Sequence, residues 1–390
     1  MNGQYNIWNK WDPLKTVMLG DCYPPSFFRN IKNHRIRGAL TQIAEETQEE
    51  LSYFESVLKE FGCTVIRPSL DHNDSILNYT NDANQVKGFQ GVPRSPLQPR
   101  DHQLIIGNYG LITGNDHPAI RQSLLEYSSN TKINLTDQPL PEFKYDQIMC
   151  PLSGDWPSYN DYKNNYKSRH FFKPHVWKEL TRIDYSTVSL FSSANVFMIG
   201  NRAYVPNRVI QESQEIVEIE KLPYFKKFKL FFHNYDGHTD GNFHPIKPGA
   251  ILSLFDVQNY NETFPSWDVC YFPDQSWKKV RGFLKIKNQV AGKWWVPGQE
   301  DNDEFTNFVE TWLKDWVGYV EETVFDVNVL VLDEHHVCVS NLNPTVVDFL
   351  KKHKMEPVHI PWKHRYFWDG GLHCITLDLY REGQQQDYFI

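Results

Sequence analysis

Short apolar runs recur along the chain in one fixed order. Toward the C-terminus, two alternating runs at 328–332 and 337–340 flank an Asp-Glu-His-His turn, a pattern that predicts a β-hairpin. A helical pattern begins at Asn343, and the run at 356–360 predicts one more strand. The predicted unit is therefore strand, strand, helix, strand.

The same order recurs upstream of this unit. The pairs Gly107–Asn108 and Gly200–Asn201 favour tight turns within two further predicted hairpins. Another turn is predicted at Pro248–Gly249, and an amphipathic helix is predicted at 41–61. The remaining predicted elements are strands at 17–19, 64–66 and 228–232 and helices at 120–127 and 211–220.

About five such units are predicted, and none of them can bury its own sheet. Units of this kind pack most simply around a common axis, which predicts an α/β fold with a propeller-like arrangement. A doubly wound parallel sheet is the competing architecture, but the repeated hairpins argue against its strict alternation of strand and helix. We expect a single domain over 1–390, with long insertions near 128–185 and 256–320 that are rich in Asn, Asp, Tyr and Trp.

The composition predicts a large buried core and narrows the range of partners. Hydrophobic residues make up 40% of the 390 residues and aromatic residues 15%. The formal net charge of -8 gives no general basic field for nucleic acid and suits small cationic substrates better. No apolar run is long enough to span a membrane, and residues 1–10 do not resemble a secretory signal. Six scattered cysteines without a CxxC pair predict reduced thiols and a cytoplasmic location.

One cysteine stands in an informative local sequence. Cys374 follows Gly370 and Gly371 and directly precedes an alternating run that predicts a strand. A thiol on a tight turn at the start of a strand can face a cleft. Taken alone, however, Cys374 fits a buried structural thiol better, since most cysteines outside disulfides are of that kind.

A histidine and two carboxylates provide a second signal. His238 and Asp240 are two residues apart on an extended segment, so their side chains point to the same face. An imidazole paired with Cys374 would activate the thiol as a nucleophile and then act as general acid and base. Arg100 and Asp101 form another polar cluster ahead of a predicted hairpin. The alternative interpretations are two unrelated loop residues and an ordinary surface ion pair.

The candidate residues share one position in their units. Asp101, Asn195, His238, Asp240 and Cys374 each lie just before or at the start of the inner strand of a hairpin. In a propeller-like arrangement these positions converge on the axis. Two carboxylates, an imidazole, an amide and a thiol around a small pocket suit a guanidinium group, which carboxylates bind in a bidentate manner.

Taken together, these motifs resemble the glycine/arginine amidinotransferase family, within the wider superfamily of enzymes that modify guanidino groups. The resemblance begins at Trp11 and covers most of the chain, with anchors at 99–108, 237–253 and, most strongly, 328–376. It implies a five-fold pseudosymmetric α/β propeller built from ββαβ units, and an enzyme without a metal or organic cofactor. Homodimers occur in the family.

The resemblance also implies roles for the candidate residues. Cys374 would be the nucleophile that forms an amidino-cysteine intermediate, and His238 the acid and base. Asp101 and Asp240 would hold the guanidinium of the donor, with Arg100 as a further substrate-binding residue. The implied reaction moves the amidino group from L-arginine to an amine acceptor such as glycine.

Two positions depart from the family pattern. The family places an Asp behind the catalytic His in an Ala-Asp-Phe segment, where this chain has Asn195 between Ala194 and Val196. Asn195 can still orient the ring of His238 through its amide oxygen, but it lacks the charge that would stabilise an imidazolium. The family's arginine transferases also use an Arg soon after the Ile-Leu-Ser strand to hold the donor carboxylate, and 254–259 contains none.

Two other functions stay open on the sequence. A hydrolase similar to arginine deiminases or dihydrolases would use the same site with water as the acceptor. A non-catalytic guanidino-binding protein would agree with the change at Asn195, although the presence of Cys374, His238, Asp101 and Asp240 argues against it.

Overall fold

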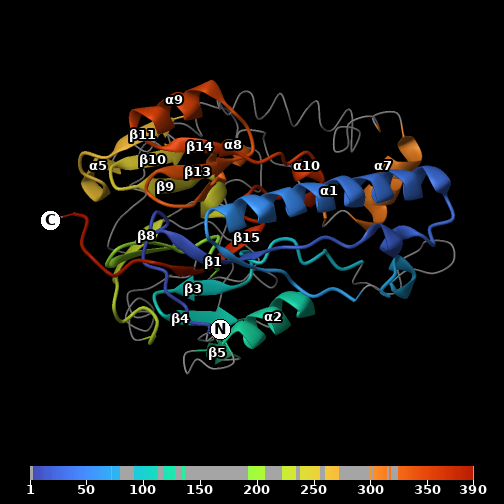
Figure 1. The fold of residues 1–390 in the computed structure, drawn as a ribbon, viewed down its shortest axis with the longest axis horizontal. Coiled ribbons are helices and arrows are strands. Elements are labelled where there is room, and N and C mark those ends of the chain that lie inside the picture. The colour runs from blue at the N-terminus through green and yellow to red at the C-terminus, as the bar shows by residue number, and fades with distance from the viewer. Residues whose placement is uncertain are drawn as a thin grey trace, which may run out of the picture.

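The computed structural model of the chain is shown in Figure 1. It describes residues 3–71, 73–79, 92–112, 117–128, 134–136, 192–206, 222–233, 238–254, 260–271, 299, 302–313, 316–317 and 324–389. Among the helices in these ranges, none is both long enough and apolar enough to cross a membrane.

The described residues form five three-stranded sheets of the same design. In each sheet, an antiparallel pair of strands is joined by a third strand that runs parallel to the second. The sheets, with their strands in that order, are β3 (Leu104–Ile106), β4 (Tyr109–Ile112) and β5 (Asn134–Thr136); β6 (Phe197–Ile199), β7 (Arg202–Pro206) and β8 (Lys229–His233); β9 (Phe243–Lys247), β10 (Ala250–Ser253) and β11 (Asp268–Tyr271); β12 (Leu330–Val331), β13 (His336–Val339) and β14 (Glu356–His359); and β15 (Thr376–Arg381), β1 (Leu14–Leu19) and β2 (Thr64–Ile66).

A helix connects the second strand to the third in four of the five sheets. These helices are α2 (Pro118–Ser128), α5 (Tyr260–Thr263), α9 (Pro344–Lys352) and α1 (His34–Glu60). In Figure 1, α9 lies at the top of the ribbon and α2 at its foot, on the outside of the sheets. The other described helices are α7 (Asp303–Trp312), α8 (Val324–Val327), α10 (Arg365–Trp368) and the 3-10 helices η1 (Pro25–Phe28), η2 (Ile76–Asn78) and η4 (Thr239–Gly241).

The fifth sheet is assembled from both ends of the chain. Strand β15 pairs antiparallel with β1, from Leu14 opposite Arg381 to Leu19 opposite Thr376, and β1 pairs parallel with β2. The two strands lie side by side at the centre of Figure 1. Because Cys374 directly precedes β15, this pairing fixes the position of the candidate nucleophile relative to the N-terminal segment.

Helix α1 is longer than the sequence pattern predicted. It begins after Asn33, whose side chain accepts hydrogen bonds from the backbone of Arg35 and Ile36 and so caps the first turn. It ends before Gly62, whose φ of 79° is left-handed and favours glycine. Its buried face packs in one apolar cluster with residues of α7, β12 and β13.

The predicted elements that fall on described residues are confirmed, and the α/β class with them. All four predicted hairpins are present, and left-handed glycines turn three of them, at Gly107, Gly200 and Gly249. The sheets are separate and three-stranded, which excludes the doubly wound sheet for this part of the chain. The predicted helix at 211–220 lies outside the described residues, as does most of 128–185.

The predicted insertion at 256–320 includes two elements of the third sheet, α5 and β11, together with α7. The rest of that range lies largely outside the described residues. A single domain with long insertions therefore stays a prediction.

A buried ion-pair network joins the fifth sheet to its neighbours. Asp378 accepts hydrogen bonds from Arg100 Nη2 at 2.7 Å and from Arg381 Nε at 2.8 Å, and all three side chains are buried. Arg381 also donates to the carbonyl oxygens of Asp12 and Val331. Burial raises the pKa of Asp378, but the charges of Arg381 and Arg100 outweigh it and bring the pKa to about 2.

Replacing this carboxylate should destabilise the protein, because two buried arginines lose their shared counterion. We expect Asp378→Asn to lower the free energy of unfolding by about 3 kcal/mol at neutral pH. The difference from wild type should shrink as pH falls from about 4 to about 2, since a depressed carboxyl pKa contributes stability only above that range. Urea unfolding at several pH values measures both effects. The control is Glu382→Gln, an exposed carboxylate that pairs with Lys15, for which we expect a change within about 0.5 kcal/mol. Equal losses in both variants would contradict the assignment.

Candidate active site

The start of the first strand in every sheet contributes a residue to one site. Asp101 precedes β3, Asn195 precedes β6, and Asn328 precedes β12. His238 and Asp240 stand at the beginning of the η4 turn that leads into β9, and Cys374 lies two residues before β15. The sequence pattern predicted this shared position for all of them except Asn328.

The starts of neighbouring sheets are hydrogen-bonded to one another. These hydrogen bonds run from Arg100 Nε to His373 O (2.7 Å), from Ser193 N to Gln103 O (2.7 Å), from Asp240 N to Ala194 O (3.2 Å) and from His373 N to Asn328 Oδ1 (3.0 Å). Helix α8, which leads into β12, contacts η4, which leads into β9. These contacts link the sheet of β15 to that of β3, then to those of β6, β9 and β12 in turn. The sheet of β12 is linked back to that of β15, so the chain of contacts is closed.

Cys374 is held on its turn by Asn328. The side-chain oxygen of Asn328 accepts hydrogen bonds from the backbone of His373 and Cys374, and its amide nitrogen donates to Cys374 Sγ at 3.1 Å. The two glycines are needed for this packing. A side chain on Gly371 would lie 2.6 Å from Asn328 Oδ1, and one on Gly370 would lie 3.3 Å from Cys374 Cβ. The Gly-Gly pair thus lets the turn approach Asn328 closely.

Three of the predicted catalytic and binding groups meet at the thiol. One carboxylate oxygen of Asp101, one ring nitrogen of His238 and Cys374 Sγ all lie within 4.8 Å of one another. His238 Nδ1 is 3.5 Å from Asp101 Oδ1, and Cys374 Sγ is 3.8 Å from Asp240 Oδ2. Asp240 and Cys374 are buried, whereas 37% of the His238 side chain is exposed to solvent. The site therefore combines a thiol, an imidazole and two carboxylates.

The electrostatics of the site disfavour a thiolate in the absence of a ligand. Burial raises the pKa of Cys374 well above its usual value, and the charges of Asp240 and Asp101 raise it further. Burial also raises the pKa of Asp240, while the charges of His238 and Lys10 oppose that rise. A positive group placed between the carboxylates would reverse the effect on the thiol.

A second histidine lies behind Asp240. His373 Nδ1 contacts Asp240 Oδ2 at 2.6 Å, and both side chains are 1% exposed. Burial, followed by the charges of Arg100 and Lys10, lowers the pKa of His373 well below its usual value. With its proton on Nδ1, a neutral His373 donates a hydrogen bond to Asp240 Oδ2. This hydrogen bond orients the carboxylate of Asp240 toward the thiol.

The predicted contact between Asn195 and His238 is not among the hydrogen bonds of the described residues. The backbone oxygen of Asn195 accepts from His233 Nε2 at 2.9 Å and from Thr239 Oγ1 at 3.3 Å. Its side-chain oxygen is buried and has no hydrogen-bond partner among the residues that the structure describes. The described carboxylate nearest to the ring of His238 in this arrangement is Asp101, so a role for Asn195 in orienting that ring stays a prediction.

Arg100 lies in the ion-pair network beneath the site. Besides Asp378, its guanidinium contacts the carbonyl oxygens of His373 and Thr376, at 2.7 and 2.8 Å from Nε. These hydrogen bonds from Arg100 hold in place the turn that contains Cys374. A substrate-binding role for Arg100 also stays a prediction.

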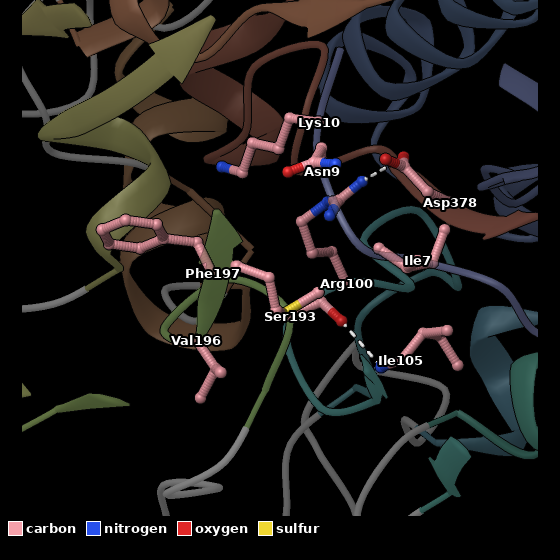
Figure 2. Close-up of a pocket in the computed structure, with 10 residues that line it drawn as sticks. Ile7, Asn9, Lys10, Arg100, Ile105, Ser193, Val196, Phe197 and Asp378 are labelled. Atoms are coloured by element: carbon pink, nitrogen blue, oxygen red, sulfur yellow. Dashed lines mark hydrogen bonds and ion pairs between the residues drawn. The ribbon is translucent and has the colours of Figure 1, made fainter. Parts of the chain in front are cut away.

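A small cavity of about 20 Å³ lies between this network and the strand β6. Figure 2 shows Arg100 reaching toward Asp378 on one side of it and Lys10 on another. The ammonium of Lys10 lies 5.8 Å from the ring centroid of Phe197. Burial lowers the pKa of Lys10 to about 7, although the charge of Asp240 opposes the shift. Lys10, which lies below the candidate site, therefore changes its charge near neutral pH. The sequence pattern did not reveal this property.

A larger cavity of about 330 Å³ opens on Asp101, and Arg94 and Gln98 also line it. Its volume is within the range of small-molecule sites. Asp101 belongs both to this cavity and to the group around Cys374 Sγ. Gln98 packs closely against Gly370, where a side chain would lie 2.7 Å from Gln98 Nε2. The donor atoms of Asp101, His238 and Cys374 are also close enough to bind a metal ion. The expectation that no metal or cofactor is needed stays a prediction.

The site combines a buried thiol, an imidazole and two carboxylates, and comparisons with known proteins show which class of protein the chain resembles. No family model matches the chain. Glycine amidinotransferase, mitochondrial, of Danio rerio is 23% identical over 412 aligned residues, which cover 98% of this chain and 84% of that protein. Glycine amidinotransferase, mitochondrial, of Gallus gallus is 22% identical, with the same coverage.

Two solved amidinotransferases share the fold over the whole chain. An inosamine-phosphate amidinotransferase from Streptomyces griseus aligns with a TM-score of 0.60 at 17% identity and covers 100% of both chains. An amidinotransferase of the saxitoxin biosynthetic pathway from Microseira wollei aligns with a TM-score of 0.59 at 18% identity and covers 99% of both. These two structures show a shared fold, and together with the two sequence relatives they confirm the resemblance to the amidinotransferase family.

The contacts of Asn328 predict a specific phenotype. Asn328→Ala should lower the free energy of unfolding by about 1–3 kcal/mol, because two buried backbone N–H groups lose their acceptor. It should also lower kcat, because the turn that positions Cys374 loses its support. The control is Asn341→Ala, which removes a hydrogen bond to Asp326 on the same side of the fold, and we expect its kcat to be unchanged. Urea unfolding and steady-state kinetics measure the two quantities. An Asn328→Ala protein with normal kcat would contradict the role of Asn328.

Proposed function

We propose that this protein is an amidinotransferase that moves the amidino group of a guanidino donor, L-arginine, to a small amine such as glycine. The reaction proceeds through an amidino-cysteine intermediate on Cys374. The observation that carries this proposal is the approach of Cys374 Sγ, the ring of His238 and a carboxylate oxygen of Asp101 to within 4.8 Å of one another. Asp240, at 3.8 Å from Sγ, adds the second carboxylate.

The groups have complementary tasks in the first half-reaction. Asp101 and Asp240 bind the guanidinium of the donor and place its central carbon against Sγ. The thiol proton passes to His238 as sulfur attacks that carbon. The bond from carbon to the substituted nitrogen then breaks, His238 returns the proton to the leaving amine, and the amidino group stays on sulfur. With arginine as donor, the leaving amine is ornithine.

The electrostatics couple this attack to binding of the donor. Burial, Asp240 and Asp101 keep Cys374 protonated while the pocket holds no cation. A guanidinium between the two carboxylates cancels their effect on the thiol and favours the thiolate next to its target. Reactivity of Cys374 toward other electrophiles is thereby limited.

In the second half-reaction an amine replaces ornithine. His238 takes a proton from the amine, the amine nitrogen attacks the amidino carbon, and the thiolate leaves. If water attacked this intermediate, the product would be urea, and the enzyme would be a hydrolase. Citrulline would form only if ammonia, and not ornithine, left in the first half-reaction. The amidinotransferases among the relatives, including an L-arginine:L-lysine amidinotransferase from Pseudomonas savastanoi, support transfer.

The arrangement of the sheets supports the same proposal. Five sheets of one three-stranded design, whose starts are hydrogen-bonded or packed against one another around the site, support the five-fold α/β propeller of ββαβ units that we propose. In such a fold the axis collects one residue from each blade. We retain the expectations of a homodimer and of a cytoplasmic location as parts of this proposal, although the vertebrate relatives have mitochondrial in their names.

Product analysis tests the function directly. The protein is incubated with arginine and a panel of amines, and the products are identified by mass spectrometry. We expect ornithine and an amidinated amine, and with arginine alone an added amidino group on the peptide that contains Cys374. Cys374→Ala should abolish both while the fold is retained. Ornithine and urea, or citrulline, without amidinated amine would support hydrolysis, and labelling of another cysteine would contradict the assignment of the nucleophile.

The supporting carboxylate of His238 can be tested with two variants. Because Asp101 lies 3.5 Å from His238 Nδ1, Asp101→Asn should lower kcat by about 100-fold or more even at saturating donor. Asn195→Ala should lower kcat much less, since Asn195 forms no described hydrogen bond to His238. Measuring kcat at saturation separates this effect from weaker binding of the donor. If Asn195→Ala lost as much kcat as Asp101→Asn, Asn195 would be the residue that orients the ring.

A further inference from the structure

A buried lysine lies beneath the site and has no task in the proposed reaction. Only 9% of Lys10 is exposed, and its ammonium lies 5.8 Å from the ring centroid of Phe197. Its neighbours fix its place in the chain, because Asn9 Oδ1 accepts a hydrogen bond from Gly200 N at 2.7 Å and Trp11 is fully buried. The side chain of Lys10 is therefore held in the interior of the protein.

The buried arginines next to Lys10 have an acidic partner, whereas Lys10 does not. Arg100 and Arg381 occupy the two oxygens of Asp378. Lys10 lines the same cavity as Arg100 and Asp378 (Figure 2), but among the residues that the structure describes it forms neither a hydrogen bond nor an ion pair. The charge that acts most strongly on Lys10 is that of Asp240, whose carboxylate lies 3.8 Å from the thiol. Lys10 and a bound cation would therefore share one carboxylate.

The charges of these buried groups balance when Lys10 is protonated and no cation is bound. Because Asp378 is shared by two arginines, this network keeps one positive charge uncompensated. With His238 neutral, that charge and Lys10 together balance the two carboxylates of the pocket, Asp101 and Asp240. A guanidinium between these carboxylates adds one positive charge. Uncompensated charge is costly in a buried region, and loss of the proton from Lys10 restores the balance.

Lys10 is able to lose this proton near neutral pH. Burial lowers its pKa to about 7, with Asp240 opposing the shift and Arg100 adding to it. The remaining titratable and charged groups that interact with Lys10 are Asp378, Arg381, His244 and His373. Burial lowers the pKa of both histidines well below the usual value, so both are neutral. Lys10 is therefore the group beneath the site that titrates near pH 7.

We propose that Lys10 is a positioning residue that releases its proton to solvent when a guanidinium binds between Asp101 and Asp240. As an ammonium, Lys10 balances Asp240 while no substrate is bound, and as a neutral amine it leaves Asp240 to the substrate. The step transfers only a proton, and no other bond forms or breaks. This inference rests on the proposed function, since it takes the bound cation to be a guanidinium, and it makes the affinity for the donor depend on the charge of Lys10.

Proton release on binding tests this proposal without turnover. Binding of arginine to Cys374→Ala, which has no thiol to ionise, is measured by calorimetry at pH 7 in buffers of different ionisation enthalpy. We expect release of about 0.5 proton per arginine, because a group with a pKa of about 7 is half-protonated at pH 7. Adding Lys10→Met, which retains an unbranched side chain without the charge, should remove this release. Adding Lys15→Met instead, at an exposed lysine that pairs with Glu382, is the matched control and should leave it unchanged.

The affinity for arginine should depend on pH in the same sense. Protonated Lys10 opposes the substrate cation, so affinity is full above the pKa of Lys10 and falls as pH drops below it. If binding lowers that pKa by about one unit, arginine binds about fivefold more weakly at pH 6 than at pH 8. Lys10→Met should bind tightly at both pH values, and Lys10→Arg, which stays charged, weakly at both. A pH dependence caused by His238 would persist in Lys10→Met.

The outcomes separate this proposal from the proposed reaction. Proton release that disappears with Lys10→Met supports the proposal even if no amidino transfer is detected. Equal release with and without Lys10→Met overturns it even if transfer proceeds, and so does loss of arginine binding in a folded Lys10→Met protein. Urea unfolding checks the fold, and we expect Lys10→Met to be at least as stable as its parent, because a buried charge is removed. Absence of arginine binding to Cys374→Ala also overturns the proposal.

Discussion

The buried ion pairs among Arg100, Asp378 and Arg381 are the constraint on which the site depends. They join strand β15 to the segment before β3 and, through backbone carbonyls, to the N-terminal segment and β12. Arg100 also contacts the carbonyl of His373, one residue before the thiol. Charges buried this deeply are costly unless all partners are in place, so the network favours one arrangement of these segments. The position of Cys374 follows from that arrangement.

The site above the network balances opposite charges in a small volume. Asp240 and Asp101 raise the pKa of the Cys374 thiol, and the charge of Lys10 opposes the rise in the pKa of Asp240. Two carboxylates next to a thiol disfavour its thiolate form when no cation is present. A cation bound between the carboxylates removes this effect and favours the thiolate. In the proposed function, the same electrostatics account for both selection of a guanidinium substrate and activation of the thiol.

The sequence predicted the repeated hairpins and the shared position of the site residues, because both are local patterns. It missed Asn328, since the contact of Asn328 with Cys374 joins positions that are 46 residues apart. Asn328 could have been found from its place at the start of β12, which matches that of Asp101 before β3. The interpretation of Arg100 as substrate-binding depended on the resemblance, whereas its buried partner Asp378 is visible only in the folded chain.

The central claim is that carboxylates suppress the thiol of Cys374 until a cation binds. The most direct measurement is the rate of alkylation of Cys374 by iodoacetamide as a function of pH, in wild type and in Asp240→Asn without substrate. The account predicts that the rate profile of Asp240→Asn moves to lower pH, so that the thiol becomes more reactive at neutral pH while turnover is lost. A profile that stays in place or moves to higher pH would contradict the claim.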